Sequence, residues 1–232
     1  MGLIDRWTAL AGPETRRLGS ELVARYAEPH RRYHTGDHLR VVLDLVDELA
    51  APAAPPRSPA TAVVEVDGEV DVEAVRLAAW FHDAVYDPAR ADNEERSARL
   101  AERMLADTDL PAATVLEVAR LVRLTETHDP TPGDRSGEVL CDADLAVLAG
   151  DPAAYAAYAA AVREEYAFVP DDLFARGRAD VLRGLLARPA IFRTASGRDR
   201  FETAARHNIR TELTLLHAMP AGPAEPPGPA GP

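Results

Sequence analysis

Apolar residues recur with the 3.6-residue period of an α-helix along most of the chain, and this pattern constrains the fold more than any other feature. Four segments carry apolar residues at i, i+3, i+4 and i+7: 14–27, 36–50, 70–85 and 93–107. Five further segments also predict helices: 111–128, 143–149, 152–167, 170–187 and 196–218. We therefore expect an all-α helical bundle.

A single domain should extend over residues 1–218. The chain has 232 residues, of which 47% are hydrophobic, and this is enough for one sizeable core. Residues 51–70 form a Pro/Ala-rich insertion that could contain a small hairpin around Asp67 and Gly68. The Pro/Gly-rich tail, 219–232, is expected to be disordered, because these residues neither pack nor propagate a helix.

Charge and composition exclude several classes of protein. The net charge of −12 argues against general nucleic-acid binding, because phosphate backbones attract basic surfaces. The absence of lysine excludes a P-loop or a Schiff-base enzyme, and the single Cys141 excludes an internal disulfide. We expect a cytoplasmic protein with no membrane contact, because no apolar run reaches about 20 residues or resembles a signal peptide. Whether it forms a homo-oligomer stays open.

Histidine interrupts the apolar pattern in the segment 36–50. His38 shares one helix face with Val42, Leu45 and Leu49, so it should point inward. A lone histidine on an apolar face is more often a core residue than a ligand, and His38 needs polar partners to count as a ligand. His34 precedes the same segment and is a second candidate for the same role.

The stretch WFHDAVYD, residues 80–87, supplies two possible partners, His82 and Asp83. Neighbours on a helix diverge by about 100°, close to the angle between adjacent ligands of an octahedral ion, so both could bind one metal. A divalent cation would also offset the cost of burying the carboxylate. The structural alternative is that His82 closes the helix and Asp83 makes a local hydrogen bond.

A third group lies in CDADLAVL, where Asp142 and Asp144 are two residues apart and point in different directions once helical. Asp142 is placed to cap the short helix predicted over 143–149, which leaves Asp144 as the candidate ligand. The opposite assignment of the two aspartates remains open.

These motifs together resemble the HD superfamily of metal-dependent phosphohydrolases. The resemblance rests on YHTGDHL, WFHDAVYDP, DNEERSA, CDADLAVL, GRADVL and AARHNI, and it covers about residues 5 to 217. It implies an HD-type helical bundle with additional C-terminal helices. It also implies that His38, His82, Asp83 and Asp144 bind one divalent ion, with His34 left as a substrate contact.

The resemblance implies hydrolysis of a small phosphate ester, such as a nucleotide, by water that the metal activates, with Asp83 serving in catalysis as well as binding. Nitrogen and oxygen ligands suit Mn²⁺, Mg²⁺, Fe²⁺, Co²⁺, Ni²⁺ or Zn²⁺, so the sequence does not indicate which of these metals binds. Two alternatives remain: a di-iron oxygenase, since some HD relatives use two irons, and a non-catalytic binding or regulatory protein whose metal staples the helices.

Two further residues are candidates for the reaction. Glu94 shares the inward face of the segment 93–107, where a carboxylate could position water or protonate a leaving group, unless the helix end frays and exposes it. Asp92 and Glu95 have the spacing of a reciprocal helix cap and are interpreted as structural. His128 could contact the substrate or hold a second metal, although a histidine at a helix end is common.

Arginine must supply any positive charge for a phosphate, because the chain contains no lysine. Arg163 and Arg178 are the candidates, drawn from the C-terminal segments that carry the resemblance. A stripe of Tyr155, Tyr158 and Tyr166 in the segment 152–167 is interpreted as packing rather than as a platform for a base.

Overall fold

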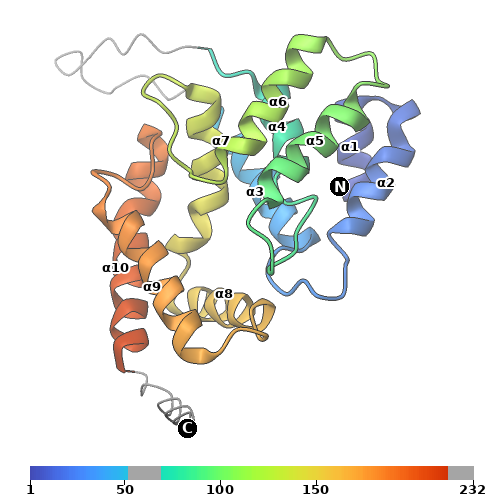
Figure 1. The fold of residues 1–232 in the computed structure, drawn as a ribbon. Helices are drawn as coiled ribbons and strands as arrows, with labels where there is room; N and C mark the ends of the chain where they lie inside the picture. Colours follow the sequence, from blue (N-terminus) through green and yellow to red (C-terminus); the bar gives the residue numbers. More distant parts are fainter. Residues whose placement is uncertain (52–68, 219–232) are drawn as a thin grey trace, which may run out of the picture.

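The computed structural model describes residues 1–51 and 69–218, and this part of the chain is all-α, without a strand (Figure 1). Its helices are α1 Leu3–Ala11, α2 Arg16–Arg25, α3 Gly36–Leu49, α4 Val72–Phe81, α5 Asn93–Leu105, α6 Ala112–Leu124, α7 Arg135–Leu145, α8 Pro152–Glu165, α9 Asp171–Ala187 and α10 Ala195–Ala218. Two 3₁₀ turns, η1 Pro13–Thr15 and η3 Ala146–Ala149, follow α1 and α7. The all-α prediction is confirmed.

Two helices differ from the sequence-based prediction. Helix α1 was not predicted at all, and α7 begins at Arg135, well before the predicted segment 143–149. The reason for the second error is local: Gly133 turns the chain with φ 86°, and Asp134 caps the helix by accepting the N–H of Gly137. Because Gly133 and Gly137 are only four residues apart, the sequence of this segment resembles a loop, although the helix begins within it. The hairpin and the tail predicted from sequence lie outside the described residues.

The larger core joins α1 to α7. Trp7 of α1 is fully buried, and its ring meets Trp80 and Phe81 of α4 edge to face at centroid distances of 5.3 and 6.1 Å. The apolar faces of α3, α5 and α6 close around α4, seven of whose ten residues are buried. Because α4 is surrounded in this way, the turn that follows it is held at the centre of the molecule.

A second apolar cluster joins η3 to α8, α9 and α10. Its members include Leu182 of α9, Phe192 in the segment before α10, and Ile209 of α10, all fully buried. Phe201 packs against both clusters and so connects them. In Figure 1, α1 and α2 lie at one end of the molecule and α9 and α10 at the other, with α3 to α7 between them.

No single helix among the described residues is long and apolar enough to span a membrane. The segments 135–149 and 152–165 meet the length and composition criteria only when taken together, and they are bent by 106° relative to each other.

Candidate metal centre

Four side chains from three helical segments converge between α3, α4 and α7. His38 Nε2 lies 3.1 Å from His82 Nε2, 3.2 Å from Asp144 Oδ1 and 3.4 Å from Asp83 Oδ2. His82 Nε2 lies 3.0 Å from Asp83 Oδ2 and 3.6 Å from Asp144 Oδ1. Adjacent ligands of an ion bound at about 2.1 Å are about 3.0 Å apart, so these distances suit a common metal. His38, His82 and Asp144 form a group that could hold a metal ion.

The local sequence explains why these groups meet. His38 lies in the first turn of α3 on its buried face, whereas His82 and Asp83 follow directly after α4, where the chain leaves the helix. The Nδ1 atom of His82 lies 2.9 Å from the carbonyl oxygen of Ala79. When a metal displaces the Nε2 proton, donation from Nδ1 to that carbonyl would hold the ring with its Nε2 lone pair directed at the cluster.

Burial and mutual charge shift the pKa values of all four groups. Burial alone would lower the pKa of His38 and His82, but Asp83 and Asp144 raise both values above the usual range. Burial would likewise raise the pKa of the two aspartates, but the facing histidines hold both pKa values well below the usual range of an aspartate. The two carboxylates therefore stay ionised opposite protonated histidines, and a metal bound in the cluster would take the place of the histidine protons.

Arg31, a residue that the sequence did not single out, fixes the turn that carries Asp83. Its side chain is fully buried, and its guanidinium donates to the carbonyl oxygens of His34 and Asp83 at 3.0 and 2.8 Å. These hydrogen bonds tie the segment before α3 to the turn after α4. An arginine in a loop carries no sequence signal of burial, because most arginines are exposed.

His128 orients the fourth member of the cluster. Its Nε2 atom lies 2.7 Å from Asp144 Oδ2, while Asp144 Oδ1 faces His38 and His82. The backbone of His128 has a positive φ of 49°, which is uncommon for a residue other than glycine and tends to persist at functional sites. This conformation turns the chain after α6.

A cavity of about 430 Å³ opens beside the cluster. Asp144 and His128 line it, together with His34, Glu94 and Arg178. Burial raises the pKa of Glu94, and the charges of Asp83 and Glu126 act in the same direction. A carboxyl group with a raised pKa can exchange a proton closer to neutrality, so Glu94 has the location and the chemistry of an acid or base.

His34 lies in the wall of the cavity rather than in the cluster. Its Nδ1 atom lies 2.7 Å from Glu165 Oε2, which leaves the opposite edge of the ring for a ligand. The buried Glu165 also accepts the backbone N–H groups of Arg32, Tyr33 and His34 and the hydroxyl of Tyr86. Sequence reasoning missed Glu165, since a glutamate in the last turn of a helix ordinarily faces solvent.

The two arginine candidates have different environments. Arg178 lines the cavity and donates to both carboxylate oxygens of Glu212 and to the hydroxyl of Tyr158. Arg163 does not line it: the guanidinium donates to the carbonyl oxygens of Tyr166 and Val169 and pairs with Asp171. The interpretation of Arg163 as a substrate contact is therefore replaced by a role in holding the turn after α8.

Arg188, which the sequence did not single out, is a better candidate than Arg163. It lines the cavity and donates to the carbonyl oxygens of Thr127 and His128 at 2.7 and 2.6 Å.

Two helix caps predicted from sequence are wrong. Asp142 does not cap a short helix over 143–149. It is fully buried inside α7 and accepts the N–H groups of Arg193 and Thr194 and the hydroxyl of Thr194, just before α10. Burial raises the pKa of Asp142 to about 6. Its structural role is correct, but the helix that it supports is distant in sequence.

Asp92 and Glu95 make no reciprocal cap at the start of α5. Asp92 pairs with Arg90, and Glu95 pairs with Arg99 and Arg123. The arginines that neighbour both carboxylates compete successfully for them, because a charge-assisted hydrogen bond is stronger than a bond to a neutral N–H.

The fold and the cluster define this chain as an all-α protein with a buried His/Asp group that could hold a metal ion. No family model matches the chain, and no curated protein matches its sequence.

Proposed function

We propose that this protein is an HD-type, divalent-metal-dependent hydrolase of a small phosphate ester. The observation that carries the proposal is the convergence of His38, His82, Asp83 and Asp144 at ligand-like separations, directly beside a cavity. These are also the four positions that the resemblance to the HD superfamily implies. The geometry and the sequence motifs thus support the same ligand set.

The charge of the cavity supports a need for a cation. Four carboxylates line it, and only two arginines: Glu94, Glu126, Asp144, Asp180, Arg178 and Arg188. A phosphate anion would be repelled by this excess of negative charge. A divalent cation would remove the excess, supply an activated water and offset the charge that develops on the phosphoryl oxygens.

The protein's own residues have separable roles in this proposal. His128 holds Asp144 through its outer oxygen, and Arg178 offers the N–H groups left over from Glu212 and Tyr158 to a phosphate oxygen. Glu94 accepts a proton from the attacking water or returns one to the leaving oxygen. His34, held at Nδ1 by Glu165, also lines the cavity and contacts the substrate there.

The test begins with metal content. We expect close to one divalent ion per chain in the wild-type protein and a loss of most of it in His82→Ala and Asp144→Ala, measured by elemental analysis after dialysis. His207→Ala, at an exposed histidine of α10, is the matched control and should retain the metal. Unchanged metal content in both cluster variants would contradict the site.

Turnover is then measured as phosphate release from a panel of nucleotides and phosphorylated metabolites with Mn²⁺. We expect release by the wild-type protein and at least a 100-fold loss in Asp83→Asn, since metal-activated water supplies most of such a reaction's rate. Two bound irons per chain would instead favour the oxygenase. A bound metal without turnover across the panel would favour the non-catalytic binding protein.

A further inference from the structure

A second cavity, of about 480 Å³, adjoins the one beside the metal centre. Four residues line both: His34, Tyr158, Arg178 and Val181. The remaining wall of the second cavity is almost entirely apolar: Val162, Tyr166, Val169, Leu173, Phe174 and Gly177. The two cavities thus differ in character, since four carboxylates line the first and none lines the second.

One face of α9 forms a wall common to the two cavities. Gly177, Val181 and Gly184 are spaced at i, i+4 and i+7, so they lie along one side of the helix. Gly177 lines the second cavity, Gly184 the first, and Val181 both. A ligand that followed this face would reach from one cavity into the other.

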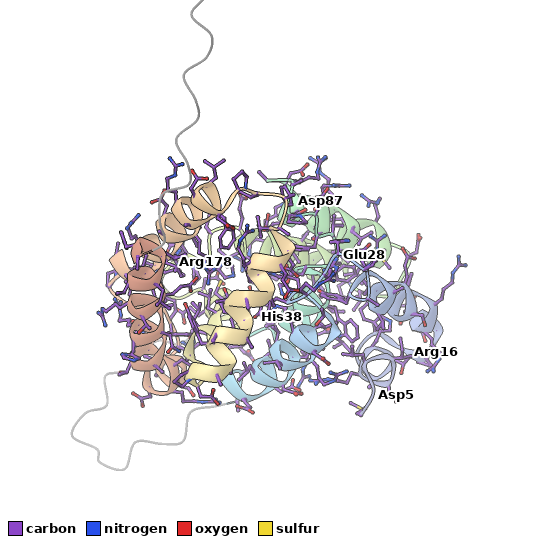
Figure 2. All side chains as sticks on the ribbon, turned by 90° about the horizontal axis from the view of Figure 1, so that it is seen from below. Asp5, Arg16, Glu28, His38, Asp87 and Arg178 are labelled. Atoms are coloured by element: carbon purple, nitrogen blue, oxygen red, sulfur yellow. The ribbon has the colours of Figure 1, made fainter. Side chains whose placement is uncertain are left out.

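The metal centre is close to the boundary between the cavities. The ring of Tyr33 lies 4.7 Å from that of His38 and also 4.7 Å from that of Tyr158, measured between centroids. Tyr158 is therefore two ring contacts from a candidate metal ligand. Figure 2 shows His38 near the middle of the view and Arg178 to its upper left, on the side away from Asp5 and Arg16.

Arg178 is held in place at this boundary. Its guanidinium lies over the ring of Tyr158, 5.2 Å from the centroid, and Glu212 fixes two of its nitrogens. Only 10% of its side chain is exposed. A rigid arginine between a polar and an apolar cavity suits a ligand that carries an anionic group on one side and an apolar group on the other.

The mouth of the second cavity is unusually apolar for a surface. Leu173 and Val181 are 52% and 59% exposed, among the most exposed large apolar side chains in the described part of the chain. Tyr166 and Phe174 add two aromatic walls, whose ring centroids lie 5.9 Å apart. Flat rings and aliphatic side chains favour a planar, apolar group over a sugar or a polyol, which would leave its hydroxyl groups unpaired.

We propose that the second cavity is a substrate subsite, and that the substrate is a phosphate monoester whose alcohol part carries a planar apolar ring. The phosphate lies beside Asp144 and Arg178, and the ring lies against Tyr166 and Phe174. This inference rests on the proposed function, because it assigns the reacting end of the ligand to the metal centre.

Gly177 gives a clean test of the subsite. A Cβ atom added at Gly177 would meet nothing within 4 Å, so there is room for a side chain there, and Gly177→Leu is designed to occupy the second cavity. Gly184 is equally open but lines only the first cavity, which makes Gly184→Leu the matched variant. Ala187→Leu, at an exposed position of α9 that lines neither cavity, controls for an added leucine.

The ligands for the test are two non-hydrolysable phosphonates, naphthylmethylphosphonate and methylphosphonate, with dissociation constants measured by calorimetry in the presence of Mn²⁺. We expect the wild-type protein and Ala187→Leu to bind the naphthyl ligand about tenfold more tightly, since it buries apolar area that the methyl ligand lacks. Gly177→Leu should lose this preference and keep its affinity for methylphosphonate. Gly184→Leu should weaken the binding of both.

Equal affinity for the two phosphonates in the wild-type protein, binding of neither, or an unchanged preference in Gly177→Leu would overturn the subsite. A change of oligomeric state in Gly177→Leu, with the preference intact, would also overturn it and assign the face to contact between chains. Failure of the proposed hydrolysis is distinguishable from failure of the subsite. If the protein is not a hydrolase, no substrate releases phosphate, but the dissociation constants of the two phosphonates still show whether the second cavity binds the apolar ring.

Discussion

At the scale of single residues, His128 shows how backbone conformation and chemistry combine. Its positive φ places the imidazole against Asp144, whose other oxygen faces the candidate ligands. The left-handed region carries a conformational cost for every residue but glycine, and the cost is smaller for asparagine, aspartate and histidine than for most others. The backbone of His128 thus lowers the stability of the fold slightly, while its side chain holds the Asp144 carboxylate in one orientation. Residues that orient a metal ligand in this way are common around metal sites.

Substitution of His128 by asparagine separates these effects. We expect His128→Asn to keep the fold and the stability, because asparagine tolerates a positive φ, and to lower the affinity for the metal about tenfold or more, because Asp144 loses its partner. Affinity is measured by competition with a metal indicator, and stability by thermal unfolding without metal. Equal metal affinity in the variant would show that the contact between His128 and Asp144 is incidental.

At the scale of helices, the contact between α1 and α2 depends on a missing side chain. A Cβ atom at Gly19 of α2 would lie 2.4 Å from the ring of Trp7 in α1. Trp7 cannot easily move, because its Nε1–H is bonded to both oxygens of Thr15 and its ring packs against Trp80. Glycine is required here for close packing and not for a turn.

Alanine substitutions at two helical glycines should therefore have opposite effects. We expect Gly19→Ala to lower the free energy of unfolding by about 1–3 kcal/mol, because the core becomes overpacked. Gly177→Ala should raise it by up to about 1 kcal/mol, because alanine favours the helix and the space is open. Urea unfolding of both variants measures the difference, and a stability gain in Gly19→Ala would contradict the packing argument.

At the scale of the whole molecule, Glu165 connects α8 to the segment before α3. Burial alone would raise its pKa, but the hydrogen bonds and charge of His34, the backbone N–H groups and Tyr86 lower the pKa to about 2. A depressed pKa in the folded state contributes stability above the unfolded value of 4.5, and that stability is lost as the pH falls from about 4.5 to about 2.

Glu165→Gln should remove this pH-dependent contribution. We expect the variant to be less stable than the wild-type protein by up to about 3 kcal/mol at pH 7, with the difference shrinking as the pH falls toward 3. The free energy of unfolding in urea, measured at both pH values, gives the result. Glu164→Gln, at the exposed neighbour, is the control and should show little difference at either pH. If the difference in the free energy of unfolding between the wild-type protein and Glu165→Gln did not change with pH, the depressed pKa of Glu165 would be refuted.

The sequence alone predicted the helical class, and through the resemblance it indicated the four groups of the candidate metal centre. Helical periodicity is local, since it depends on residues within a few turns, and His38 was placed on a buried face by that periodicity. The pairing of His82 with Asp83 was visible because neighbours in sequence are neighbours in space. The resemblance then supplied Asp144, which periodicity alone left open against Asp142.

Only the tertiary structure decided which other polar residues surround the cavity. Asp142 stabilises the start of α10, Glu165 joins α8 to the segment before α3, and Arg163 holds a turn instead of facing the cavity. The partners of Asp142 and Glu165 are more than 50 residues away, where local pattern does not reach, whereas the partners of Arg163 lie in the turn that follows it within eight residues. Buried polar groups are fixed by the hydrogen-bond partners that folding brings to them, and those partners come from anywhere in the chain.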